Sequence, residues 1–211
     1  MKWEELLAIS GAEPVFSSSL LLAGKISAAQ VRLQLTRWVK TGRLVQLRRG
    51  IYVLAPAWRK VEPHPFVVAN KLQRGSYISL QSALSFHGVI PEYVPVVTSV
   101  GPGRPETLRN QLGSFQFKHI ASGMLYGYTL LEAAPRQFAF VASAEKALLD
   151  LVYLTPQADS PDYIRELRLQ NPDLINIQTL HDMAGRSGRP KLLRAVKIVD
   201  ELLKVEKGET I

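Results

Sequence analysis

The stretch from Ile26 to Leu54 reads ISAAQVRLQLTRWVKTGRLVQLRRGIYVL and combines a capped helix, a glycine stop and a short basic hairpin. Ser27 stands where a helix N-cap is expected, because its hydroxyl can accept a hydrogen bond from a free backbone N–H one turn later. Gly42 ends the helix, since glycine tolerates the left-handed conformation that closes one. The stretch therefore predicts a helix bounded at both ends and followed by two strands.

The helix that starts after Ser27 has two chemically different sides. Steps of about 100° per residue place apolar side chains on one side, which we expect to face the core. These residues are Val31, Leu35, Trp38 and Val39. Most residues of the opposite side are long polar or cationic chains that can reach base edges and phosphates from the major groove of DNA. They are Gln30, Leu33, Arg37 and Lys40, with Gln34 and Thr41 at the margin.

The hairpin is predicted from two apolar-rich segments, residues 44–47 and 51–54, which flank the turn Arg48-Arg49-Gly50. Glycine supplies the positive φ that a tight turn needs. Two adjacent arginines at such a tip repel each other unless they meet a negative group, and phosphate is the obvious counter-charge. A helix in the major groove with a basic hairpin along the backbone is the winged form of helix-turn-helix binding.

Residues 1–60 are therefore predicted to form a winged helix-turn-helix domain. A first helix is expected at Trp3–Ser10 and a short second one after Ser17-Ser18-Ser19. Residues 62–65, Glu-Pro-His-Pro, are a stiff polar connection at which the domain ends. We expect base contacts from Gln30, Gln34 and Arg37 and phosphate contacts from Lys40, Arg43, Arg48 and Arg49. Ser27 and Leu33 complete the predicted DNA-binding set.

The charge distribution supports this domain assignment. Of the net charge of +8, residues 1–60 carry +7, from ten Lys or Arg and three Glu. Residues 61–211 carry sixteen basic and fifteen acidic residues, a net charge of +1. The excess positive charge lies on the segment with the helix and hairpin, as expected of a domain that displaces counterions from phosphates.

Residues 61–211 are predicted to form an α+β domain with a helical C-terminal tail. Strands are expected at residues 94–100, 115–120, 126–131 and 138–141. Helices are expected at residues 66–72, 80–87, 144–154, 161–169, 177–184 and 191–205. Ser79 and Ser143 stand at N-cap positions, and the turns contain glycine and proline.

The composition indicates the cellular compartment and excludes some kinds of chemistry. The 211 residues include no cysteine, which excludes disulfides and a cysteine nucleophile, and no apolar run of about eighteen residues is present. The start of the sequence is unlike a signal peptide, so a cytoplasmic protein without a membrane segment is expected.

The sequence predicts no catalytic, metal or cofactor site. Four scattered histidines lack the spacing of a metal site, and the nearby acidic residues Asp150, Asp159 and Asp162 lack a recognisable nuclease pattern. Lys146 and Asp150 stand four residues apart on one predicted helix. This spacing is typical of a surface salt bridge that contributes roughly 0.3–0.5 kcal/mol.

Five segments, taken in their order, resemble the AbiEi-type antitoxins of type IV toxin–antitoxin systems. The resemblance covers roughly residues 15–155, and none of its segments is a catalytic signature. The segments are Arg49-Gly50-Ile51-Tyr52, Tyr77-Ile78-Ser79, Ser82-Ala83-Leu84, His87-Gly88 and Ala142-Ser143-Ala144-Glu145-Lys146-Ala147-Leu148-Leu149-Asp150.

The resemblance implies a winged helix-turn-helix that represses its own operon at inverted repeats in double-stranded DNA. It also implies a C-terminal domain that opposes a partner nucleotidyltransferase toxin without forming a stable complex. No cofactor is expected. Because an inverted repeat needs two copies of the protein, we expect a monomer in solution that meets a second copy on DNA.

A second basic cluster lies near the C-terminus. Its Gly-Arg-Pro core resembles a minor-groove AT-hook but lacks the arginine before the glycine. The cluster comprises Arg186, Arg189, Lys191, Arg194 and Lys197. It could contact DNA, an acidic toxin surface or solvent alone.

Two alternatives remain open at this point. One is a transcription regulator whose second domain senses a small ligand. The other is a nuclease or nucleotidyltransferase that its N-terminal domain delivers to DNA.

Overall fold

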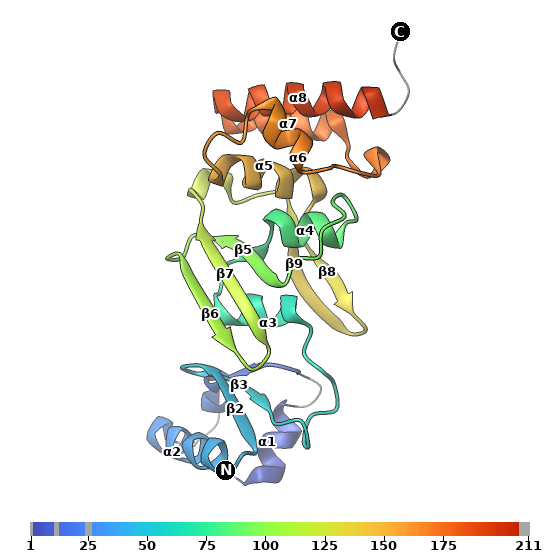
Figure 1. The fold of residues 1–211 in the computed structure, drawn as a ribbon. Helices are drawn as coiled ribbons and strands as arrows, with labels where there is room; N and C mark the ends of the chain where they lie inside the picture. The colour runs from blue at the N-terminus through green and yellow to red at the C-terminus, as the bar shows by residue number, and fades with distance from the viewer. Residues whose placement is uncertain (1, 11–12, 24–26, 207–211) are drawn as a thin grey trace.

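The structure is a computed structural model that describes residues 2–10, 13–23 and 27–206, and Ile26 lies outside them. The described residues form a mixed α+β fold with eight α-helices, a three-stranded antiparallel sheet and a six-stranded mixed sheet (Figure 1). The predicted fold class, with helices at the C-terminal end, is confirmed. None of the described helices combines the length and the apolar character needed to cross a membrane.

The α-helices are α1 (Trp3–Ser10), α2 (Ala28–Lys40), α3 (Pro65–Leu72), α4 (Leu80–Phe86), α5 (Ala144–Leu154), α6 (Pro161–Glu166), α7 (Ile177–Ser187) and α8 (Pro190–Glu206). The strands are β1 (Phe16–Ser17), β2 (Leu44–Arg48), β3 (Ile51–Leu54), β4 (Tyr77–Ile78), β5 (Val96–Gly101), β6 (Glu106–Asn110), β7 (Gly113–His119), β8 (Tyr128–Ala134) and β9 (Gln137–Ala142). Short 3₁₀ helices are η1 (Ser18–Ala23), η2 (Ser122–Met124) and η3 (Pro172–Leu174).

The N-terminal elements follow the predicted order with two differences. The second helix, η1, is a six-residue 3₁₀ helix, a form that proteins use in short pieces. The hairpin gains a third strand, β1, which pairs with β3 so that the sheet order is β1-β3-β2. Strands β4 and β6 were also not predicted. β4 is only two residues long, and the residues of β6 include no large apolar run.

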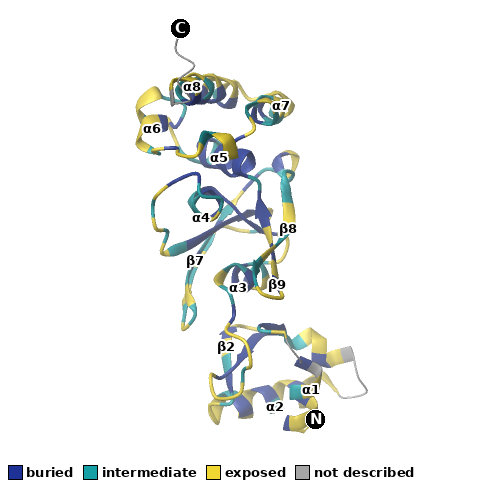
Figure 2. Cartoon of the chain, turned by 90° about the vertical axis from the view of Figure 1, so that its right-hand side faces the viewer, coloured by how far each residue is buried: buried dark blue, intermediate teal, exposed yellow. Residues whose placement is uncertain are grey.

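Two hydrophobic clusters organise the chain. The N-terminal cluster contains Trp3, Leu6, Val31, Leu35, Trp38 and parts of the hairpin. The larger cluster belongs to the six-stranded sheet and its helices, yet it also includes Leu47, Ile51 and Val53 of the hairpin. Strand β3 is therefore buried on both sides, and the hairpin lies between α2 and α3 (Figure 2).

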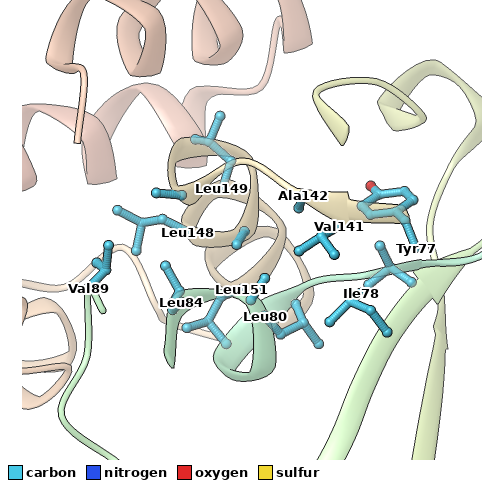
Figure 3. Close-up of a cluster of buried hydrophobic side chains, with 14 of the residues drawn as sticks. Tyr77, Ile78, Leu80, Leu84, Val89, Val141, Ala142, Leu148, Leu149 and Leu151 are labelled. Atoms are coloured by element: carbon cyan, nitrogen blue, oxygen red, sulfur yellow. The ribbon is translucent and has the colours of Figure 1, made fainter. Parts of the chain in front are cut away.

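The larger cluster holds the six-stranded sheet, whose strand order is β6-β7-β5-β4-β9-β8. Helix α5 follows β9 directly and packs against α4. Tyr77, Ile78 and Val141 from the central strands lie close to Leu84 of α4 and Leu148 of α5 (Figure 3). Four of the five segments quoted in the sequence analysis thus contribute residues to one hydrophobic cluster.

Candidate nucleic-acid interface

Helix α2 is bounded by the residues that the sequence indicates. Ser27 Oγ accepts a hydrogen bond from the backbone N–H of Gln30 at 3.3 Å. At the other end, the backbone N–H of Thr41 donates to the carbonyl of Arg37 at 2.9 Å, and Gly42 has a φ of +69°. Val31, Leu35 and Trp38 are buried and Val39 is half-buried, so the predicted core side of the helix is confirmed.

The opposite side of α2 faces solvent. Gln30, Leu33, Arg37 and Lys40 are exposed, and Gln34 is half-buried at the margin. Ser27 is exposed too, although its hydroxyl already serves as the N-cap. The predicted helical set is therefore accessible along one side of the helix, which lies at the end of the molecule opposite α8 (Figure 1).

Arg32 on the same helix was not among the predicted residues. Arg32 is exposed and stands on the margin of α2 opposite that of Gln34, close to the apolar side. In the part of the chain that the structure describes, Arg32, Arg37 and Lys40 form no ion pair. Three cations on this helix are thus free to meet an external anion.

Arg43, which follows the helix, has partners inside the N-terminal unit, which comprises the described residues up to 60. The described residues from 61 onward form the second unit. Its guanidinium lies 5.3 Å from the ring centroid of Trp3 and 5.8 Å from that of Trp58. A cation over an aromatic face is attracted by the electrons of the ring. Two tryptophans that are distant in sequence therefore hold Arg43 half-buried, and a phosphate would have to reach it there.

The hairpin β2–β3, which we call the wing, differs from the prediction in the partners of an arginine at its tip. Gly50 has the predicted positive φ, at +82°. Arg48 Nη1 donates to Glu106 Oε1 at 2.6 Å and to the carbonyl of Leu72 at 3.0 Å, so its counter-charge comes from within the chain. Arg49 is exposed and forms no ion pair with any described residue.

The burial of β3 explains this orientation of the wing. Because Ile51 and Val53 pack into the larger cluster, the hairpin tip lies against the second unit instead of projecting freely beside α2. The partner Glu106 stands 58 residues away from Arg48 in the sequence and lies on a strand that was not predicted. No local pattern could reveal this contact.

The second basic cluster is largely engaged in contacts within the chain. Arg186 lies over the ring of Tyr126 at 4.1 Å, and Arg189 lies over Tyr153 at 4.7 Å. Lys191 donates to the carbonyl of Thr155, and Arg194 pairs with Asp159 at 2.6 Å. Lys197 is exposed. Four of these five cations therefore have intramolecular partners, as expected if they help to pack α7, α8 and the turn between them.

Lys146 and Asp150 correct an expectation. They form the predicted pair along α5, but both side chains are completely buried, so the prediction of a surface salt bridge is wrong. Asp150 Oδ2 also accepts hydrogen bonds from Tyr77 Oη at 2.9 Å and from Ser79 Oγ at 2.8 Å. Ser79 stands at the N-cap of α4, yet its hydroxyl binds Asp150 instead of capping that helix.

Burial dominates the electrostatics of this network. It raises the pKa of Asp150 and lowers the pKa of Lys146, while the attraction between the two charges acts in the opposite direction on each. Burial and the neighbouring Asp150 also raise the pKa of Tyr77, so the phenol stays protonated and donates. The side chains of Tyr77 on β4, Ser79 at the N-cap of α4, and Lys146 and Asp150 on α5 thereby supply one another's hydrogen-bond partners in the core.

Two histidines have clear structural partners. His64 Nδ1 accepts a hydrogen bond from the backbone N–H of Phe66 at 3.2 Å and caps α3, and partial burial lowers the pKa of His64. His87 Nε2 is 2.7 Å from the carbonyl oxygen of Ala142, so it joins the end of α4 to the end of β9. Within the described residues, no cluster of three His, Asp or Glu could hold a metal ion.

No protein-family model and no curated protein matches the chain. Among solved structures, the chain is similar to the crystal structure of the RV2827C protein from Mycobacterium tuberculosis, at 16% sequence identity and a TM-score of 0.53. The similarity covers 93% of this chain and 74% of that one. At this identity the comparison shows a shared fold across nearly the whole chain.

Proposed function

We propose that the chain is a DNA-binding autorepressor and antitoxin of a type IV toxin–antitoxin system. The observation that carries the DNA-binding half is the solvent side of α2. There Gln30, Arg37 and Lys40 are exposed, and the charge excess of the chain is concentrated in the same segment. Arg32 adds a further exposed cation at the margin of the helix. Exposed cations beside amide side chains are suited to phosphates and base edges.

The length of α2 is compatible with a major groove. With thirteen residues, α2 is about 20 Å long at 1.5 Å per residue, enough to lie in a major groove. We propose base contacts from Gln30, Gln34 and Arg37, with Leu33 against a thymine methyl group. Lys40 and Arg49 would hold phosphates. Arg43 and Arg48 would join them only by leaving, or sharing, their present partners.

The antitoxin half depends on the resemblance to the AbiEi-type family. The structure supports it in one respect. Segments that carry the resemblance, although distant in the sequence, contact one another through their own quoted residues. Tyr77 and Ser79 bind Asp150, and His87 binds the Ala142 carbonyl oxygen. We infer that these residues maintain the fold and that the second unit opposes a nucleotidyltransferase toxin without enzymatic activity, cofactor or stable complex.

The DNA-binding half is tested with the double variant Arg37→Gln/Lys40→Gln. Affinity for duplexes from the region upstream of its own gene is measured by fluorescence anisotropy over a salt series. Each lost phosphate contact should make the dependence of log affinity on log salt shallower by about one unit. The matched control, Arg136→Gln/Arg165→Gln, removes two exposed cations of the second unit and should leave the slope unchanged. Equal changes in both variants would contradict the proposal.

The antitoxin half is tested separately in cells that express a neighbouring nucleotidyltransferase-like gene. Co-expression of the wild-type chain should restore growth. The Arg37→Gln/Lys40→Gln variant should also restore growth when it is expressed from an unrelated promoter, because the second unit is intact. Failure of the wild-type chain to restore growth would refute this half alone.

A further inference from the structure

Strand β9 carries its largest side chains on the side away from the core. Ala139 and Val141 are buried, whereas Phe138 is 53% exposed and Phe140 is 45% exposed. In the sheet, Phe140 lies opposite Leu130 of the edge strand β8, and Leu130 is 55% exposed. Three large apolar side chains therefore form one patch at the edge of the sheet. Such a patch commonly marks a binding surface.

The patch is one wall of a groove. Helix α3 and the turn that follows it form the other wall, with Val67, Lys71 and Arg74 facing the space. The groove has a volume of about 450 Å³, within the range of roughly 300–1,000 Å³ that is usual for small-molecule sites. Asn70 Oδ1 accepts the backbone N–H of Phe140 at 2.6 Å, which fixes the two walls relative to each other.

The two cations of the groove make only weak contacts. Lys71 Nζ lies 3.3 Å from Glu13 Oε2, and both side chains are exposed. Arg74 is exposed and donates to Ser19 Oγ over a long 3.4 Å. Solvent screens exposed pairs of this kind, so their net attraction is small. An anion that also buries apolar surface in the groove can replace Glu13 and Ser19 as their partner.

We propose that this groove binds an aromatic carboxylate. Its ring system would pack on Phe138, Phe140 and Leu130, and its carboxylate would accept hydrogen bonds from Arg74 and Lys71. Glu13 and Ser19 belong to the unit that carries α2, so the ligand would loosen a tie between the two units. That coupling depends on the proposed DNA-binding function, whereas ligand binding itself does not.

Binding is tested by calorimetric titration of the full chain, without DNA, using three probes of matched shape. 2-Naphthylacetate should bind with a stoichiometry of one. The neutral alcohol 2-(2-naphthyl)ethanol and the cationic 2-(2-naphthyl)ethylamine should bind about tenfold more weakly or not at all, since neither carries the negative charge that strengthens hydrogen bonds from Arg74 and Lys71. Equal binding of all three probes, or no binding of the acid, would overturn the proposal.

Two variants localise the site. Arg74→Gln should weaken 2-naphthylacetate binding about tenfold, and Phe138→Ser/Phe140→Ser should abolish it; circular dichroism checks that both are folded. Arg109→Gln and Tyr93→Ser are the matched controls, since both residues are exposed and lie outside the groove. If the wild-type chain instead dimerises in solution, and Phe140→Ser makes it monomeric without any probe binding, a second copy is the occupant and the proposal is wrong.

The coupling is tested last, by measuring DNA affinity with and without saturating 2-naphthylacetate. A change in affinity that Arg74→Gln removes supports the coupling, and an unchanged affinity refutes it. If the chain binds the probe but no DNA, the proposed DNA-binding function fails while the groove proposal stands.

Discussion

Helices α2 and α5 have the same type of N-cap but lie in opposite environments. Ser27 and Ser143 both accept a hydrogen bond from the backbone three residues later, at 3.3 Å and 3.2 Å. Yet α2 leaves one polar side in solvent, whereas nine consecutive residues of α5, from Ala144 to Val152, are buried. Local sequence sets where a helix starts, and the packing around the helix sets what its charges do.

The charged residues of the two helices illustrate this difference. On α2, the cations are exposed and have no ion-pair partner among the described residues, so they can interact with an external anion. On α5, the single cation Lys146 is enclosed with Asp150 and serves the fold. Four predictions test this contrast.

The largest effect is expected from Asp150→Ala. Removing the carboxylate leaves Lys146 buried without a counter-charge and deprives Tyr77 and Ser79 of their acceptor. The free energy of unfolding should fall by about 3–5 kcal/mol, measured by urea denaturation. The control is Asp162→Ala, which removes the exposed partner of Arg165 and should change stability little. Similar losses in the two variants would contradict the buried-network interpretation.

A smaller effect is expected from Arg37→Gln on α2. If Arg37 contacts a base, affinity for the operator should fall by about 1–3 kcal/mol, with much less change for an unrelated duplex. Paired binding measurements on the two duplexes provide the test. Equal losses on both would assign Arg37 to a phosphate, and unchanged affinity on both would remove it from the interface.

Glu106→Gln tests whether the ion pair between Arg48 and Glu106 keeps the wing arginine away from DNA. Loss of the carboxylate frees Arg48 for a phosphate, so DNA should bind more tightly and the salt dependence should steepen by about one unit. Glu62→Gln, which removes the exposed partner of Arg59, serves as the control. Unchanged or weaker binding by Glu106→Gln would show that Arg48 acts only within the fold.

The smallest effect concerns His64. Because burial lowers its pKa, the folded chain binds fewer protons at this residue than the unfolded chain just below the ordinary value of 6.5. Stability should therefore decrease as the pH falls through that range. His64→Asn keeps an N-cap but does not titrate, so its stability curve should be flatter between about pH 5 and pH 8. Parallel stability curves for the wild-type chain and His64→Asn would contradict a contribution of His64 to the pH dependence.

Much of the candidate interface was predictable from local sequence. The limits of α2, its buried and solvent sides and the glycine turn of the wing all follow from caps and periodicity within a few residues. The partners of Arg43 and Arg48 were not predictable, because Trp3, Trp58, Leu72 and Glu106 come from elsewhere in the chain. The groove beside Phe140 was equally hidden, since only the packed sheet shows which side of β9 remains uncovered.

The sequence by itself determined the caps of α2 and α5, the order of the helices, six of the nine described strands and the concentration of positive charge in the first sixty residues. These features depend on neighbouring residues and on composition. The tertiary structure decided that Lys146 and Asp150 are buried, that Ser79 binds Asp150 instead of capping its helix, and that the wing rests on the second unit. The reason is physical: the interaction of a charge depends on its burial and on partners that only folding brings within hydrogen-bonding distance.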